Sequence, residues 1–173
     1  MTVYEATAKE HFEKIEAFLA RQPSKSPSLV CWNLPSKKAD WLQAKRQVDP
    51  NCDVLFCEDA ERVIRVVWVK ERRGLTGLNE PKISTKGSAC VEYEDLKKGN
   101  LQFVKELLKY KVRKDIEFGL VGAQYVGVPA LVDAAKTLLG DALTIQNEVE
   151  SPVAGKLFRV YCDYSKVPRE WLK

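Results

Sequence analysis

The spacing of apolar side chains divides the N-terminal part of the chain into a helix, a strand and a second helix. Apolar residues recur every three or four positions over 5–20, which predicts an amphipathic helix. A polar segment with two prolines separates this helix from an apolar run at 28–34, whose length and composition predict a strand. Ser36 is a favourable N-cap for a further helix that runs to position 47.

The same alternation continues through the rest of the chain. Pro129 and Gly140 bracket one helix, because proline favours a first helical turn and glycine favours a C-terminal cap. Residues 72–85 contain glycine, proline and basic side chains, which predicts a flexible loop. The pattern further predicts a helix at 100–112 and strands at 53–57, 62–71, 88–94, 116–121, 143–146 and 157–161.

Composition narrows the class of protein without identifying it. The chain has 173 residues, 45% of them hydrophobic, and it contains no apolar run long enough to span a membrane. It carries no recognisable leader, and its five cysteines form no Cys-x-x-Cys pair. We therefore expect an intracellular protein, nuclear or cytoplasmic and not secreted, with reduced thiols. With His11 as the single histidine and no nucleophile motif, we assign no catalytic residue, metal or cofactor.

Charge is concentrated in the middle of the sequence. The net charge is +4, yet the segment from Arg65 to Lys114 holds 13 basic against 6 acidic residues. A basic segment of this kind is compatible with a phosphate-binding surface, and equally with an ordinary solvated surface.

Two short motifs in the correct order resemble an RNA recognition module. Residues 86–93 follow the order basic, glycine, any, small, any, valine, any, aromatic, as in the module's longer signature. Residues 29–34 end in Asn33-Leu34 before a proline and resemble its shorter signature. Within this family, the pair Arg72-Arg73 and the start of the longer motif are most similar to the module of La and La-related proteins.

The resemblance implies a fold and a division of the chain. The fold would be α+β, a ferredoxin-like βαββαβ sandwich in which four strands are backed by two helices. Residues 28–121 would form this module, after an N-terminal helix and linker at 1–27. Residues 122–173 would form a C-terminal α/β extension, or a degenerate second half-module.

The resemblance also implies a binding surface on the outer face of the sheet. Alternate side chains of a strand face opposite sides, so Ser88 and Cys90 would stand where the family carries its base-stacking aromatics. Trp32 on the first strand could replace one of those platforms, whereas Trp68 could face either the RNA or the core. The implied RNA-binding residues are Trp32, Asn33, Trp68, Lys70, Arg72, Arg73, Lys82, Lys86, Ser88 and Cys90.

Three functions remain open at this point. The first is a non-catalytic protein that binds single-stranded RNA, with a protein partner in a ribonucleoprotein complex and with no membrane partner. The second is a protein-interaction scaffold that keeps the fold but lacks the stacking aromatics. The third, with the least support, is a metal-dependent nuclease that uses scattered carboxylates.

Overall fold

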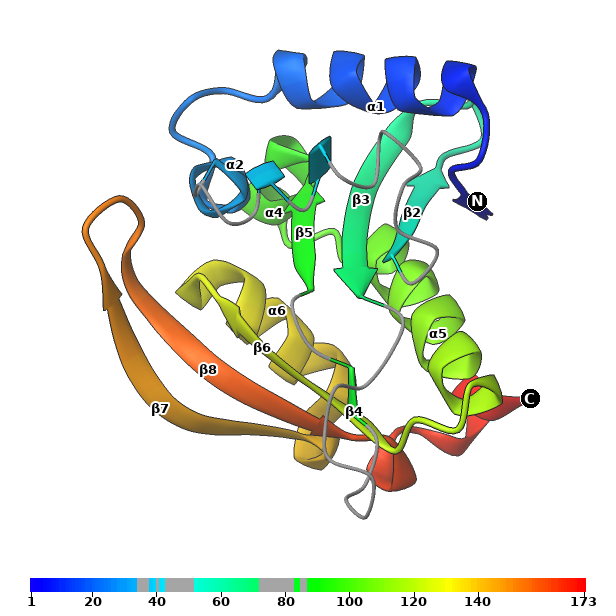
Figure 1. Ribbon diagram of the computed structural model, residues 1–173, viewed down its shortest axis with the longest axis vertical. Coiled ribbons are helices and arrows are strands. Elements are labelled where there is room, and N and C mark those ends of the chain that lie inside the picture. The colour runs from blue at the N-terminus through cyan, green and yellow to red at the C-terminus, as the bar shows by residue number, and fades with distance from the viewer. Residues whose placement is uncertain (34–37, 40, 43–51, 72–82, 85–86) are drawn as a thin grey trace.

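The strands form two separate four-stranded sheets (Figure 1). The computed structural model describes residues 1–33, 38–39, 41–42, 52–71, 83–84 and 87–173. The first sheet has the order β1-β2-β3-β5, and its neighbouring strands are all antiparallel. These strands are β1 (Thr2–Glu5), β2 (Cys52–Glu58), β3 (Ile64–Glu71) and β5 (Ser88–Val91).

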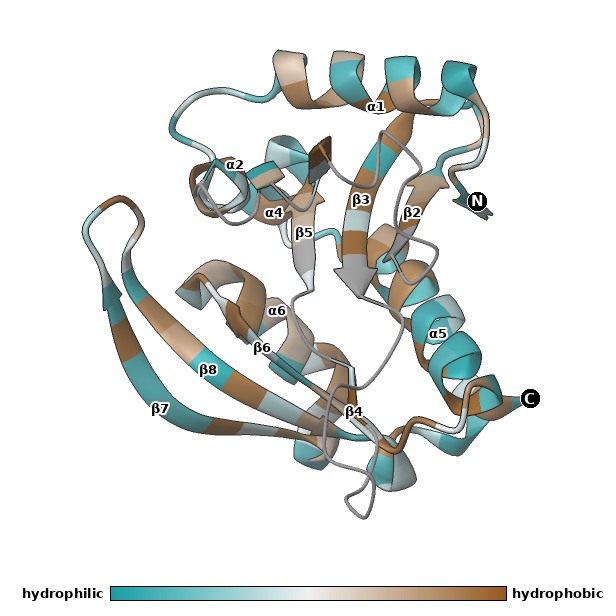
Figure 2. Ribbon diagram, viewed as in Figure 1, coloured by the Kyte–Doolittle hydropathy of each residue, from teal (hydrophilic) through white to brown (hydrophobic). Residues whose placement is uncertain are grey.

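The second sheet is built from the C-terminal strands. Its order is β4-β6-β8-β7, in which β4 and β6 are parallel and the other pairs are antiparallel. β7 is exposed along most of its length, and Figure 2 shows it as largely hydrophilic. The strands are β4 (Ile83–Ser84), β6 (Gly122–Gly127), β7 (Leu143–Ser151) and β8 (Gly155–Asp163).

Helices cover both faces of the first sheet and one face of the second. α1 (Lys9–Arg21) and α5 (Gln102–Glu117) contact opposite faces of the first sheet. α6 (Pro129–Leu139) covers the second sheet, with proline in its first turn and Gly140 at positive φ after its end, as the sequence predicted. The short helices are α2 (Pro27–Trp32), α4 (Tyr93–Lys98) and the 3-10 turns Gly140–Ala142, Tyr164–Lys166 and Arg169–Leu172.

Two apolar clusters hold these layers together. On one face of the first sheet, Phe18 of α1 packs with Val67 and Cys90. On the other face, Leu107 of α5 lies in a cluster that continues through β8 and α6 into the second sheet. Trp171 is only 1% exposed and belongs to this second cluster, so the C-terminal turn is part of the core.

The expectation of a ferredoxin-like sandwich was wrong. The apolar run expected as its first strand forms α2, because a short apolar segment after Pro27 can be a buried helix as well as a strand. The strand expected at 116–121 instead holds the end of α5 and the turn at Gly119. α1 also covers the sheet face that the RNA recognition module leaves open.

Other expectations hold in part. The strands predicted near 53–57 and 62–71 and the helix predicted near 100–112 are present as β2, β3 and α5. The first predicted helix is preceded by an unexpected strand, β1. Of the helix expected from Ser36 to 47, only positions 38–39 and 41–42 are described, and these are helical; the loop expected at 72–85 lies mostly outside the described residues.

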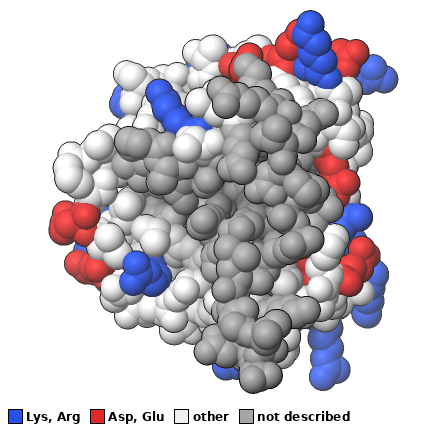
Figure 3. All heavy atoms as spheres, in the orientation of Figure 1, with Lys and Arg blue, Asp and Glu red and all other residues white. Residues whose placement is uncertain are grey.

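The described surface has mixed charge. In Figure 3, basic and acidic side chains alternate around the rim of the visible face, so the described residues form no single basic surface there. Among the described helices, none has the length and apolar character needed to cross a bilayer.

Candidate functional site

The two sheets part between β5 and β6. In the part of the chain that the structure describes, β5 is the last strand of its sheet, and β6 pairs on its outer side with the two residues of β4. Figure 1 shows β5 and β6 running at an angle to each other and not side by side as paired strands. Among the described residues, each strand therefore leaves part of its backbone edge unpaired by a neighbouring strand, and such an edge can form hydrogen bonds with another extended chain.

An apolar cavity of about 50 Å³ lies at this split. Ala89 of β5 and Tyr125 of β6 line it from the two strands, and Leu107 lines it from α5. Trp32 of α2 and Val132 of α6 close other sides. A cavity of this size has room for a small apolar group, and it is much smaller than the ~300–1,000 Å³ that holds a whole drug-sized ligand.

The edge of β5 that faces away from β3 is occupied by a side chain at Val91 and is unoccupied at Ala89 in the described part of the chain. Glu92 donates its N–H to the carbonyl of Arg65 on β3, so the alternation of an antiparallel ladder turns the backbone of Val91 and Ala89 away from β3. At Val91, the Ser28 hydroxyl accepts the backbone N–H (3.1 Å) and lies 3.3 Å from the carbonyl oxygen. At Ala89, no described side chain forms hydrogen bonds with the backbone N–H and C=O, and the residue lines the cavity.

Trp68 brings an unsatisfied donor to the same place. Its side chain is 6% exposed and lines the cavity, and its Nε1 has no hydrogen-bond partner among the described residues. The ring meets Tyr125 edge-on at a centroid distance of 5.5 Å. A Cβ added at Gly87 would lie 2.6 Å from Cζ2 of the ring, so this glycine lets the indole occupy its position.

A buried ionic cluster supports the indole from α5. Lys111 is 2% exposed, and its Nζ lies 5.3 Å from the centroid of the Trp68 ring. The ammonium group is 3.3 Å from a carboxylate oxygen of Asp115 and donates to the Tyr164 hydroxyl at 2.9 Å. The Tyr164 hydroxyl in turn donates to Asp115. This geometry satisfies the buried charges and fixes Lys111 beside the indole.

Burial keeps the nearby hydroxyl and thiol groups protonated. Removal from water raises the pKa of Tyr125 above its ordinary value, and the same cause raises the pKa of Tyr164. Burial also raises the pKa of Cys162 to about 11 and that of Cys90 to about 12. These thiols are therefore weak nucleophiles near neutral pH.

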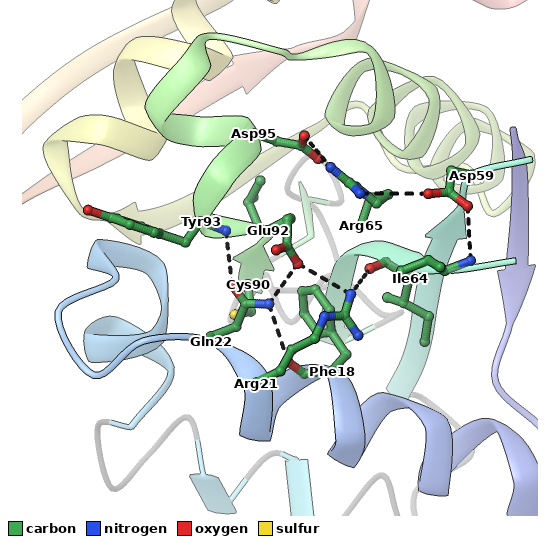
Figure 4. Close-up of polar contacts among 12 residues, drawn as sticks. Phe18, Arg21, Gln22, Asp59, Ile64, Arg65, Cys90, Glu92, Tyr93 and Asp95 are labelled. Atoms are coloured by element: carbon green, nitrogen blue, oxygen red, sulfur yellow. Dashed lines mark hydrogen bonds and ion pairs between the residues drawn. The ribbon is translucent and has the colours of Figure 1, made fainter. Parts of the chain in front are cut away.

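The end of β5 that leads into α4 is closed by a polar network (Figure 4). Glu92 accepts from Arg21 at 3.3 Å and from the Gln22 side-chain amide at 2.8 Å. Asp95 accepts from two nitrogens of Arg65, at 2.9 and 2.6 Å. Each carboxylate is thus held by groups of this chain.

The structure places four of the residues expected to bind RNA. Trp32 is 3% exposed and stands 6.1 Å from the Trp41 ring, in a helix and not on a strand. Cys90 is fully buried beneath α1, and Trp68 faces the core on the opposite side of the sheet. Asn33 is exposed at the end of α2. These four do not form a common surface.

The other expected residues lie outside what the structure describes. This holds for the positions of Arg72, Arg73, Lys82 and Lys86 and for the side chains of Lys70 and Ser88. Sequence reasoning missed Ala89 and Tyr125. The site depends on the separation of two strands that are distant in sequence, and no local pattern of residues indicates such a separation. Gly87, next to the cavity, does belong to the motif at residues 86–93.

The single histidine, His11, has a structural role at the start of α1. The Nδ1 atom of His11 accepts the backbone N–H groups of Thr7 (3.1 Å) and Ala8 (3.2 Å), so the ring caps the start of α1. The described residues contain no group of three potential metal ligands.

Comparison with solved structures identifies the fold as that of GNAT-family acetyltransferases. A spermidine N-acetyltransferase from Vibrio cholerae, in complex with CoA and spermine, has a TM-score of 0.66 at 11% identity and covers 99% of this chain and 98% of its own. An aminoglycoside N(6')-acetyltransferase from Legionella pneumophila has a TM-score of 0.62 at 9% identity, and the match covers 98% of this chain and 95% of that protein. A GNAT-family acetyltransferase from Staphylococcus aureus has a TM-score of 0.57 at 12% identity, over 94% and 98%.

No protein-family model matches the chain, and no curated protein matches its sequence. The structural likeness nevertheless corrects the function expected from the sequence. The resemblance to the RNA recognition module, the non-catalytic role and the RNA and ribonucleoprotein partners were wrong, because the whole chain has the fold of acetyltransferases. The scaffold alternative has no support either.

Proposed function

We propose that this protein transfers a short acyl group from an acyl-CoA thioester to an amine. The single observation that carries the proposal is the open edge of β5 at Ala89, beside an apolar cavity at the parting of two sheets. The likeness in fold to N-acetyltransferases along almost the whole chain gives the reaction its class.

The open edge suits the arm of the thioester. The pantetheine arm of CoA is extended and carries two amides, each with one N–H donor and one C=O acceptor. The unpaired N–H and C=O of Ala89 can pair with such an amide as a neighbouring strand would. Ser28 already occupies the equivalent groups at Val91, which limits this pairing to the cavity side.

The cavity suits the acyl end of the same molecule. Its lining is almost entirely apolar, and at about 50 Å³ it has room for an acetyl or propionyl group. Side chains such as Leu107 and Val132 keep water away from the thioester, which favours transfer to an amine over hydrolysis. Longer acyl chains would require these side chains to move.

The segment that follows β5 lacks the features of a binding site for the diphosphate of CoA. The segment between β5 and α5 folds into α4 and contains one glycine, Gly99, so it offers no glycine-rich phosphate loop. At the start of α4, the ammonium groups of Lys25 and Lys97 lie 5.5 and 6.0 Å from the Tyr93 ring centroid. We therefore propose that the pantetheine arm and the acyl group supply most of the donor's binding energy.

Tyr125 supplies a proton in this proposal. The amine nitrogen attacks the carbonyl carbon, the carbon–sulfur bond breaks, and the sulfur leaves as a thiolate that requires a proton. The Tyr125 side chain lines the cavity, and its protonated hydroxyl can give its proton to that sulfur as the thiolate forms. The proton released by the amine returns the phenolate to the phenol, so the reaction yields an amide and a free thiol.

The test is turnover with a matched pair of substitutions at the open edge. The protein is incubated with acetyl-CoA and a panel of polyamines, aminoglycosides and simple amines, and mass spectrometry detects acetylated products. Ala89→Pro removes the N–H without touching the bonds to β3 and should weaken acetyl-CoA binding at least tenfold. Ala89→Gly keeps the N–H and serves as the control. Absence of acetyl-CoA binding to the wild-type protein would overturn the proposal.

A further inference from the structure

We infer that the indole N–H of Trp68 donates a hydrogen bond to the carbonyl oxygen of the bound acyl group. The inference rests on the proposed function and assigns to Trp68 the stabilisation of the charge that develops on this oxygen. Trp68 lies directly across from Ala89 on the neighbouring strand β3, and the inference requires a ligand with an acceptor atom in the cavity.

The first support is the cost of leaving this donor unpaired. A buried tryptophan N–H normally finds an acceptor, and a buried donor without one costs about 1–3 kcal/mol. Trp68 is 94% removed from solvent, and its Nε1 is the buried side-chain atom for which the described residues provide no partner. An acceptor brought by a ligand would remove this cost.

The second support is that the indole is held in one position. Gly87 allows the ring to lie where any Cβ would collide with it, at 2.6 Å from Cζ2. Tyr125 meets the ring edge-on from β6. A donor fixed in advance stabilises developing charge better than a mobile one, because it does not have to reorient during the reaction.

The third support is the cation beside the ring. The Lys111 ammonium lies 5.3 Å from the indole centroid and is held there by Asp115 and the Tyr164 hydroxyl. A cation over an indole face draws electron density from the ring, which strengthens the N–H as a donor. Lys111 thus acts through Trp68 as a positioning residue and does not contact the substrate.

The chemical step is complete without an additional reactant. As the amine nitrogen forms its bond to the carbonyl carbon, the π electrons of the C=O group move onto oxygen, and the Trp68 N–H donates a hydrogen bond that stabilises the charge there. The electrons return when the carbon–sulfur bond breaks, and Tyr125 protonates the sulfur. The products are an amide and a thiol, in balance with a thioester and an amine.

The direct test is an NMR titration of the wild-type protein with acetyl-CoA and with CoA. Comparison of the indole N–H signals of the wild type and Trp68→Phe assigns the Trp68 signal. Acetyl-CoA should shift this signal strongly, toward the position of a hydrogen-bonded indole, and CoA without the acyl group should shift it much less. A Trp68 signal that stays in place while β5 amides respond to acetyl-CoA overturns the inference and leaves the proposed function standing. If no amide responds, both fail.

Turnover gives a second measurement. Trp68→Phe keeps an aromatic ring but removes the donor, so kcat should fall about 100-fold while the KM for acetyl-CoA changes little. Trp41→Phe is the matched control, because Trp41 is equally buried, at 7% exposure, and does not line the cavity. An unchanged kcat in a folded Trp68→Phe protein overturns the inference.

Discussion

Polar groups are paired within the chain at one end of the split between the sheets and are left without partners among the described residues at the other. At the α4 end, Glu92 and Asp95 are fully engaged by Arg21, Gln22 and Arg65 (Figure 4). At the cavity end, the backbone edge at Ala89 is open and the Nε1 of Trp68 has no partner in the described part of the chain. The first region is complete by itself, whereas the second leaves donors and an acceptor for another molecule.

This difference indicates where a ligand binds in a chain whose sequence is only distantly similar to those of its structural neighbours. Buried polar groups are almost always satisfied, so an exception in a cavity is a signal of a ligand. Conspicuous charges carry less information here, since the arginines and carboxylates of the closed end neutralise one another.

Breaking the ionic cluster behind Trp68 should have the largest effect on stability. Lys111→Met leaves Asp115 buried without its cation, and it should lower the free energy of unfolding by about 3–5 kcal/mol in urea denaturation. Lys109→Met, which removes a partly exposed partner of Glu106 on the same helix, should cost less than about 1 kcal/mol. Equal costs for the two variants would show that the cluster adds no stability.

Alkaline pH should destabilise the fold through its buried thiols. The folded-state pKa values of about 12 for Cys90 and about 11 for Cys162 exceed the ordinary value of 9.0, so the unfolded chain loses these protons first. The thiols' contribution is complete below pH 9 and disappears as pH rises through 11 and 12, on the order of 4 kcal/mol for Cys90. Urea denaturation between pH 8 and 11 measures the decline. Cys90→Ala should show a shallower decline; an identical slope would contradict this origin.

Removing the Ser28 hydroxyl that pairs with Val91 should lower the free energy of unfolding by a moderate amount. Ser28→Ala leaves the Val91 N–H buried without an acceptor and should lower the free energy of unfolding by about 1–3 kcal/mol. Ser165→Ala removes an exposed hydroxyl that donates to Asp163 and should cost less than about 0.5 kcal/mol. A Ser28→Ala protein as stable as the wild type would mean that Val91 does not depend on this hydroxyl.

The smallest expected effect concerns the diphosphate. If the closed end contributes little to donor binding, acetyl-pantetheine should replace acetyl-CoA with a change in KM of less than about tenfold, or about 1.4 kcal/mol. Steady-state kinetics with the two donors measures the ratio. A loss of 100-fold or more would mean that this end recognises the diphosphate after all.

Local signals predicted many of the elements but misread the architecture. Pro129 and Gly140 marked α6 correctly, and the Val- and Ile-rich segment near Trp68 marked β3. The apolar run after Pro27 is too short to separate a strand from a buried helix by its pattern, so α2 was missed. The motif around Gly87 was real as a strand, but its glycine serves the packing of Trp68.

The candidate site could not be predicted for a physical reason. It arises where β5 and β6 part, and these strands are separated along the chain by α4 and α5. Whether Trp68 faced the core or the outer surface was left open by the alternation of its strand. Covering of the Cys90 face by α1 is a tertiary contact that periodicity does not encode.

The most direct test of the central claim is amide hydrogen exchange at Ala89 and Val91, measured by NMR with and without acetyl-CoA. Exchange at Ala89 should slow by tenfold or more when the pantetheine arm pairs with the open edge. Exchange at Val91, whose N–H is already bonded to Ser28, should change little. Saturating acetyl-CoA that leaves exchange at Ala89 unchanged would contradict the account.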